Sequence, residues 1–113
     1  MRRHSEHADA IQPAAEAALE KIGASTVSLV PVGNGCGDIL VGWHGVNVLL
    51  ELKSGNKPQR ENQKKFEAGW NGQYAVAHSP EEAVTEVIRI ATALDAVGKL
   101  REALGVKHEE EHR

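Results

Sequence analysis

Apolar residues form short, dense runs along the chain, and two of these runs flank a turn-like pair. The runs cover residues 38–43 and 46–53, with His44-Gly45 between them. Two apolar runs around a two-residue connection are typical of a β-hairpin. Residues 39–41 and 48–50 are almost continuously apolar, which indicates a sheet covered on both faces. The sequence therefore predicts a central hairpin with helices on each side of it.

The spacing of apolar positions elsewhere predicts further elements around this hairpin. Spacings of three and four predict a helix over residues 8–22, ended by Gly23. The remaining elements expected are a strand over 27–32, a helix from Pro58 to about Trp70 anchored by Phe66 and Trp70, a strand over 73–77, and a helix capped by Ser79. In the last helix the apolar side is formed by Val84, Val87, Ile88, Ala91 and Leu94, and Gly98 is expected to divide off a shorter piece ending near Leu104.

This order of elements predicts an α/β fold with a mixed sheet flanked by helices. The chain has 113 residues, enough for one hydrophobic core. We expect a single domain over residues 1–106 and a polar, disordered tail over 107–113. Two histidines in this tail, His108 and His112, have the spacing of a zinc-protease motif, but a chance match is the better interpretation because no apolar helix holds them.

The register of the hairpin brings acidic side chains together. A two-residue turn places Asp38 opposite Glu51, and Lys53 then points to the same face of the sheet as Glu51. Two opposed carboxylates repel each other unless a cation lies between them. Either a hard divalent metal ion bound by these oxygens or a cross-strand salt bridge with Lys53 at a wet sheet edge would explain the cluster.

Composition and charge limit the class of protein. Apolar residues make up 41% and the formal net charge is −3, so we expect a soluble protein that does not coat nucleic acid nonspecifically. No apolar run is long enough to cross a membrane, no secretory signal is visible, and Cys36 is the single cysteine. These features predict an intracellular, cytoplasmic location. No organic cofactor is expected. The positive charges are concentrated just after the hairpin, which is typical of either a phosphate-binding patch or a solvated helix face.

The ordered motifs resemble the PD-(D/E)XK nuclease superfamily, and most closely the small stand-alone VRR-NUC domains of phage and bacteria. The resemblance rests on Gly37-Asp38, on the stretch Glu51-Leu52-Lys53 that follows after twelve residues, on residues 63–66 and on residues 75–79. It extends over roughly residues 8–90 and implies a restriction-endonuclease-like core. A phage or prophage gene is therefore one expected origin. The proline that usually precedes the first aspartate of the motif is replaced by Gly37.

The resemblance implies metal-dependent hydrolysis of a DNA phosphodiester. Asp38, Glu51 and the backbone carbonyl of Leu52 are expected to bind Mg²⁺ or Mn²⁺, and Lys53 is expected to orient the attacking water. Further candidate contributors are Gln63 beside Lys53 or the backbone, and Glu16 and Gln12 on the first helix, where the family often has a glutamate. The candidate DNA contacts are Lys57, Arg60, Lys64, Lys65 and Asn34.

The resemblance also suggests the substrate and the assembly. Related stand-alone domains act as homodimers on branched DNA, so we expect a structure-selective endonuclease in DNA repair that resolves Holliday junctions. The apolar stripe of Leu94, Val97, Leu100 and Leu104 is the candidate dimer surface, although it could equally complete the core. The alternatives are a monomeric nuclease acting on flaps, nicks or single strands, and a catalytically inactive DNA-binding subunit.

Overall fold

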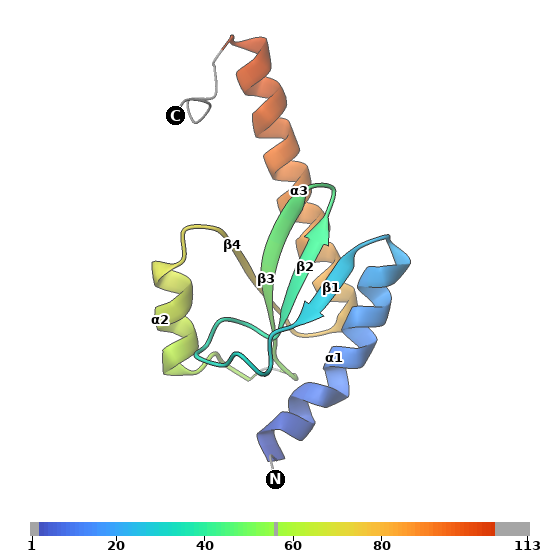
Figure 1. Cartoon of the computed structure of the whole chain (residues 1–113), viewed down its shortest axis with the longest axis vertical. Coiled ribbons are helices and arrows are strands. Elements are labelled where there is room, and N and C mark those ends of the chain that lie inside the picture. The colour runs from blue at the N-terminus through green and yellow to red at the C-terminus, as the bar shows by residue number, and fades with distance from the viewer. Residues whose placement is uncertain (1–2, 56, 106–113) are drawn as a thin grey trace.

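The computed structural model of the chain describes residues 3–55 and 57–105, and it folds into three helices around one four-stranded sheet (Figure 1). The elements are α1 (Arg3–Lys21), β1 (Ser25–Ser28), β2 (Ile39–Trp43), β3 (Val46–Leu52), α2 (Glu61–Gly69), β4 (Gln73–Ala77) and α3 (Pro80–Ala103). The α/β class and the mixed sheet flanked by helices are confirmed.

The strands lie in the order β1-β2-β3-β4, so the sequence order is also the spatial order. β1, β2 and β3 are antiparallel, whereas β4 runs parallel to β3. The predicted hairpin register is confirmed, since Val41 pairs with Val48 and Trp43 with Val46. His44 and Gly45 both have positive φ, of 52° and 78°, as a tight hairpin turn of the mirror-image type requires.

One face of the sheet carries the hydrophobic core. Alternate residues of the hairpin point to this face, where Ile39, Val41 and Leu50 are fully buried. They meet Leu19 from α1 and Val87 from α3 in the same cluster. α1 and α3 therefore lie side by side and cover this face together.

The opposite face of the sheet is covered only in part. The strand residues that do not face the core point to this side, among them Glu51 of β3 and Tyr74 of β4. α2 lies over them, on the side of the sheet away from α1 and α3 (Figure 1). The ring of Phe66 in α2 lies 5.9 Å from the ring of Tyr74. Trp70 at the end of α2 stays 45% exposed, so the prediction that it is a buried anchor is wrong.

Two predicted element boundaries were misplaced: the end of the first strand and the start of the second helix. The strand expected over residues 27–32 covers 25–28, since the amide of Val32 bonds the carbonyl of Leu29 in a turn that includes Pro31. The helix expected from Pro58 begins at Glu61. The backbone of Arg60 is still extended there, with φ −79° and ψ 166°.

The last helix was predicted correctly at its start and wrongly in its interior. The hydroxyl of Ser79 accepts a hydrogen bond from the amide of Glu82 at 3.0 Å, as expected for a cap. However, α3 continues through Gly98 without a break. Ile88 and Leu94 were expected on the buried side, and they are 37% and 40% exposed.

The predicted tail over 107–113, including His108 and His112, lies outside the described residues. No helix in the described part of the chain is long and apolar enough to cross a membrane.

Candidate active site

The three residues that the hairpin register brings together lie at the end of β3 farthest from the turn. Asp38 directly precedes β2, and its amide donates to the carbonyl of Leu50 at 2.8 Å. Its side chain also faces β3, because Oδ2 accepts a hydrogen bond from the amide of Leu52 at 2.7 Å. Both contacts fix the carboxylate against the strand that carries Glu51 and Lys53.

Glu51 is the most unusual residue of the site, because its charged side chain is completely buried. Its Oε1 accepts hydrogen bonds from the hydroxyl of Tyr74 at 2.7 Å and from the amide nitrogen of Gln59 at 3.1 Å. Its Oε2 has no hydrogen-bond partner among the described residues. A buried carboxylate oxygen that makes no hydrogen bond is costly, and it remains available to a further ligand.

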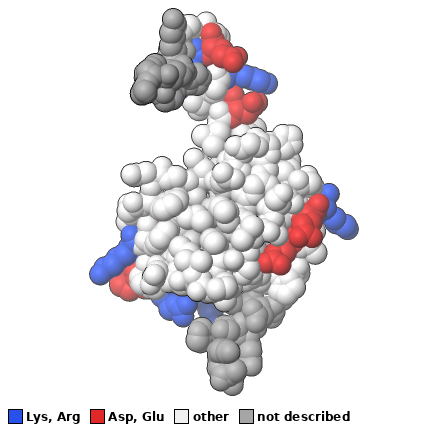
Figure 2. Space-filling view, in the orientation of Figure 1, with Lys and Arg blue, Asp and Glu red and all other residues white. Residues whose placement is uncertain are grey.

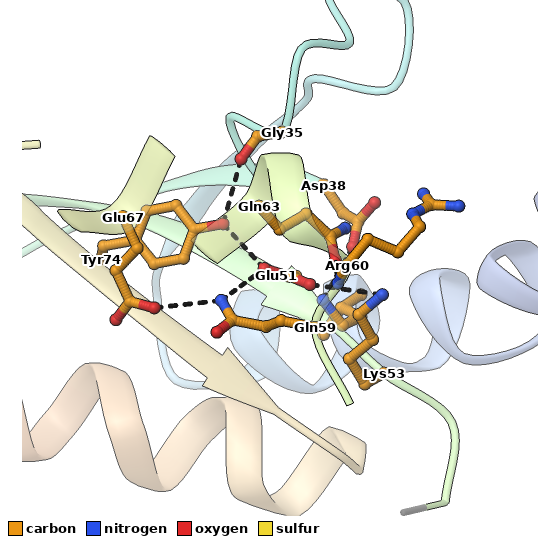
Figure 3. A network of polar contacts seen from close by, with 10 residues as sticks. Gly35, Asp38, Glu51, Lys53, Gln59, Arg60, Gln63, Glu67 and Tyr74 are labelled. Atoms are coloured by element: carbon orange, nitrogen blue, oxygen red, sulfur yellow. Dashed lines mark hydrogen bonds and ion pairs between the residues drawn. The ribbon is translucent and has the colours of Figure 1, made fainter. Parts of the chain in front are cut away.

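Lys53 supplies the positive charge nearest to that oxygen. Its Nζ lies 3.4 Å from Oε2 of Glu51, and its side chain is only 12% exposed (Figure 3). Its amide donates to the carbonyl of Ala77 at 2.9 Å, which holds the residue to β4. The salt bridge of the alternative interpretation is therefore present between Lys53 and Glu51, but the pair lies inside the molecule and not at a wet sheet edge.

Two residues that the sequence did not single out, Tyr74 and Gln59, hold Glu51 in place. The hydroxyl of Tyr74 lies between Glu51 and the carbonyl of Gly35, which is 3.1 Å away (Figure 3). Gln59 donates to Glu51 and to Glu67, at 3.1 and 3.0 Å. In the parallel register Tyr74 faces the same side of the sheet as Glu51, so a correct strand order would have been the signal that finds it.

The surroundings of Asp38 and Tyr74 disfavour the negatively charged form of both side chains. Burial, followed by the nearby charge of Glu51, raises the pKa of Asp38, although the Leu52 amide and the charges of Lys53 and Arg60 act in the opposite direction. Burial and the hydrogen bond to Glu51 raise the pKa of Tyr74 far above its ordinary value, so its hydroxyl keeps its proton and acts as a donor. At Asp38, burial and the charge of Glu51 thus outweigh the positive charges of Lys53 and Arg60, so further positive charge would stabilise the ionised carboxylate.

The candidate residues that follow the hairpin lie around the start of α2. Gln63 is buried, and its Oε1 accepts a hydrogen bond from the amide of Arg60 at 2.7 Å, so it holds backbone rather than Lys53. The guanidinium of Arg60 lies beside Asp38 (Figure 3). The side chains of Lys57, Arg60, Lys64, Lys65 and Asn34 are all exposed.

The two candidates from the first helix form a separate polar pair. Gln12 donates through Nε2 to Glu16 at 2.9 Å and to the hydroxyl of Ser28 at 3.2 Å. Its Oε1 is buried and without a hydrogen-bond partner among the described residues. Within the described part of the chain, no hydrogen bond or ion pair joins Gln12 or Glu16 to Asp38, Glu51 or Lys53. Their part in catalysis stays a prediction.

The donor atoms at the site suit a hard divalent cation. Asp38 and Glu51 both offer carboxylate oxygens, and Oε2 of Glu51 is free of hydrogen bonds. In the described residues no group of three or more His, Cys, Asp or Glu side chains is placed to share an ion. A metal here would therefore take two side-chain ligands and complete its shell from backbone oxygen, such as that of Leu52, from water and from substrate.

No family model, curated protein or solved structure matches this chain. The residues of the site and the motif resemblance are therefore the basis for the function proposed below.

Proposed function

We propose that the chain is a metal-dependent endonuclease that hydrolyses DNA phosphodiesters at Asp38, Glu51 and Lys53. It acts on branched DNA as a homodimer, with the four-way Holliday junction as the preferred substrate. The observation that carries this proposal is the fully buried Glu51, which keeps one oxygen free of hydrogen bonds at 3.4 Å from Nζ of Lys53. A protein that needed only stability would place an apolar side chain there.

Each side chain has a defined task in this reaction. Asp38 and Glu51 would hold Mg²⁺ or Mn²⁺, and the bound ion would lower the pKa of a water and offset negative charge on the phosphate. Tyr74 and Gln59 fix one oxygen of Glu51, which would leave the other available to the ion. Lys53 donates to the phosphate as negative charge develops on it.

The basic residues after β3 support a nucleic acid substrate. Lys57, Arg60, Lys64 and Lys65 are exposed in the segment that begins next to the site, although the whole chain is acidic. Exposed lysines and arginines bind phosphates without reading the bases. This favours a substrate that is recognised by the shape of its backbone. Paired nicks across a junction would also require two copies of the chain, because one site cuts one strand.

The test is cleavage of labelled four-way junction, flap, nicked duplex and single-stranded DNA in the presence of Mg²⁺ or Mn²⁺. We expect symmetric nicks in the junction, lowered at least 100-fold by Asp38→Ala and by Lys53→Ala. The exposed Lys21→Ala is the matched control and should cut like the wild type. If metal-dependent cutting is confined to another substrate, the chain is a nuclease for flaps, nicks or single strands and not a junction resolvase. DNA binding without any cutting would leave an inactive binding subunit.

A further inference from the structure

The face of the sheet that carries Glu51 also carries an apolar groove, at the other end of α2. Strand side chains alternate, so Leu49 and Asn47 of β3 point to the same face as Glu51. The groove has a volume of about 390 Å³, and its lining includes these two residues, Leu40 of β2 and Trp70. α2 lies between the two places, with its start beside the site and Trp70 just beyond its end (Figure 1).

Trp70 presents an aromatic surface to this groove. Its ring is stacked on that of Phe66, with the centroids 5.2 Å apart and the planes inclined by 21°. Phe66 in turn lies next to Tyr74, the residue that donates to Glu51. Trp70 itself remains 45% exposed, so the side of the indole away from Phe66 is open. A planar ring on that side would extend a row of aromatic rings that begins beside Glu51.

Gly72 leaves the space that the indole of Trp70 occupies. A Cβ atom at Gly72 would lie 2.9 Å from Nε1 and 3.5 Å from Cε2 of Trp70. Any side chain at this position would therefore displace the ring. The indole is thus held between Phe66 and Gly72 while much of its surface faces solvent. An aromatic side chain that is fixed before binding loses little conformational entropy when a ligand stacks on it.

Hydrogen-bonding groups lie next to this aromatic surface. β4 pairs with β3 only from Val48 onwards, so Val46 and Asn47 have no neighbouring strand on the side of β4. Because backbone groups of a strand point alternately to its two sides, one of these two residues directs its N–H and C=O towards the open edge. The carboxamide of Asn47 can also donate and accept. The groove therefore combines a stacking surface with donors and acceptors at its side.

The groove suits an uncharged ligand. All the described residues that line it are uncharged. On the face seen in Figure 2, charged side chains lie mainly at the rim of the molecule, and uncharged residues cover its centre. A phosphate would find no positive charge in such a groove, whereas a nucleobase is planar, uncharged and polar only at its edge.

We propose, on the basis of the function proposed above, that this groove binds an unpaired base of the DNA substrate, stacked on Trp70. Asn47 lies about 13 Å from Glu51 along β3, a distance that roughly two nucleotides of an extended strand would bridge. The substrate is therefore DNA that has, or can open, an unpaired nucleotide close to the cut. Base pairing is interrupted at a branch point, so a base is extruded there at lower cost than from continuous duplex.

The size of the groove favours a single base over a peptide. Sites for small ligands have volumes of about 300–1,000 Å³, and the groove lies near the lower end of this range. It has room for one base with its sugar and none for a duplex. A peptide strand added to the open edge of β3 would find only Val46 and Asn47 to pair with, which is shorter than ordinary strands.

The test is the affinity of the full chain for short single-stranded DNA of mixed sequence and for a duplex of the same length, by fluorescence anisotropy with chelator. Trp70→Ala should weaken binding of the single strand about 5-fold or more, the effect of losing one stacked base, and leave duplex binding unchanged. Trp70→Phe should restore most of the affinity. Ile88→Ala is the control, since Ile88 is 37% exposed and does not line the groove.

Gly72→Ala provides a second variant in which Trp70 is still present. Its backbone is not in the left-handed region, so alanine fits the chain there, but the added Cβ displaces the indole. Gly72→Ala should therefore weaken single-strand binding in the same direction as Trp70→Ala. Circular dichroism would show that the variants are folded. No binding of the single strand, or binding that both variants leave unchanged, overturns the proposal.

A second measurement reports the stacking directly. Trp43→Phe leaves Trp70 as the single tryptophan, since the chain has two. Single-stranded DNA should quench the emission of Trp70 in this variant, because a base lies against the indole, and duplex DNA should not. Saturation with the single strand without quenching, or equal quenching by the duplex, overturns the proposal.

These measurements separate the groove from the nuclease activity, because they are made without metal. Single-strand binding that depends on Trp70, without cleavage of any DNA when metal is added, would contradict the nuclease proposal and support the base site. Metal-dependent cleavage together with single-strand binding that Trp70→Ala leaves unchanged would overturn the base site and leave the nuclease proposal intact.

Discussion

Replacing Asp38 by asparagine separates the stability of the site from its function. The asparagine oxygen can still accept the hydrogen bond from the Leu52 amide, which is 2.7 Å from Oδ2 in the wild type. The substitution removes a negative charge whose burial and proximity to Glu51 raise the pKa of Asp38. We therefore expect Asp38→Asn to stabilise the metal-free protein at neutral pH while it removes metal binding.

The expected gain is on the order of 1 kcal/mol, the usual size for relieving a strained functional group. For a domain near 100 residues this corresponds to a rise in Tm of about 4 °C. A raised pKa means that the protonated carboxyl is favoured in the fold. The protonated carboxyl stabilises the wild-type fold fully at pH below the pKa that Asp38 has in the unfolded chain. This stabilisation is lost as the pH rises through the pKa of Asp38 in the folded protein. The difference in Tm between variant and wild type should therefore shrink as the pH is lowered.

The assay is thermal unfolding followed by circular dichroism, with chelator and with excess Mg²⁺ or Mn²⁺. Metal at about 100 times its dissociation constant should stabilise the wild type by about 2.7 kcal/mol and leave Asp38→Asn unchanged. Asp95→Asn is the control, since Asp95 is exposed and forms an ion pair with Lys99 at 3.4 Å. A variant that is less stable than the wild type in chelator, or that metal stabilises equally, would refute the reasoning.

Three further predictions concern the surroundings of the site. Tyr74→Phe removes a 2.7 Å hydrogen bond to Glu51 and should weaken Mn²⁺ binding about 10-fold by titration calorimetry; unchanged affinity would make the contact incidental. Gly35 has a φ of +77°, and a Cβ atom there would lie 2.8 Å from a backbone oxygen of α2, so Gly35→Ala should lower the free energy of unfolding in urea by about 2 kcal/mol or more. Gly33→Ala is the control and should lower it less, because a Cβ atom at Gly33 would meet nothing within 4 Å. Lys64→Ala should reduce the salt dependence of DNA binding by about one phosphate contact, and an unchanged slope would place this lysine away from the DNA.

The hairpin and its acidic cluster could be predicted because they depend on short-range rules. A two-residue turn and the alternation of strand side chains are enough to bring Asp38 next to Glu51. The start of α3 followed equally from local chemistry, through Ser79 and Pro80.

The residues that hold Glu51 could not be predicted in this way. Tyr74 reaches it only because β4 pairs in parallel with β3, and that pairing joins segments separated by a helix. Gln59 reaches it because the chain stays extended up to Arg60, where the sequence had indicated a helix. Both contacts depend on tertiary packing, which overrides local preference.

The exposed end of α3 shows the limit of a periodic pattern. The spacing of Leu94, Val97 and Leu104 predicts an apolar side on a helix. It does not say whether the core of the same chain or another copy covers that side. Only the position of α3 relative to the sheet shows that these residues lie beyond the core.

The central claim is that Glu51 holds the metal that cuts DNA, and the most direct measurement is the rate of junction nicking as a function of Mn²⁺ concentration. The wild type and Glu51→Gln would be compared under single-turnover conditions, with circular dichroism to show that both are folded. We predict that nicking by the wild type saturates with Mn²⁺ and that the variant is at least 100-fold slower. Nicking that is independent of added metal in the presence of chelator, or equal in the two proteins, would contradict this account.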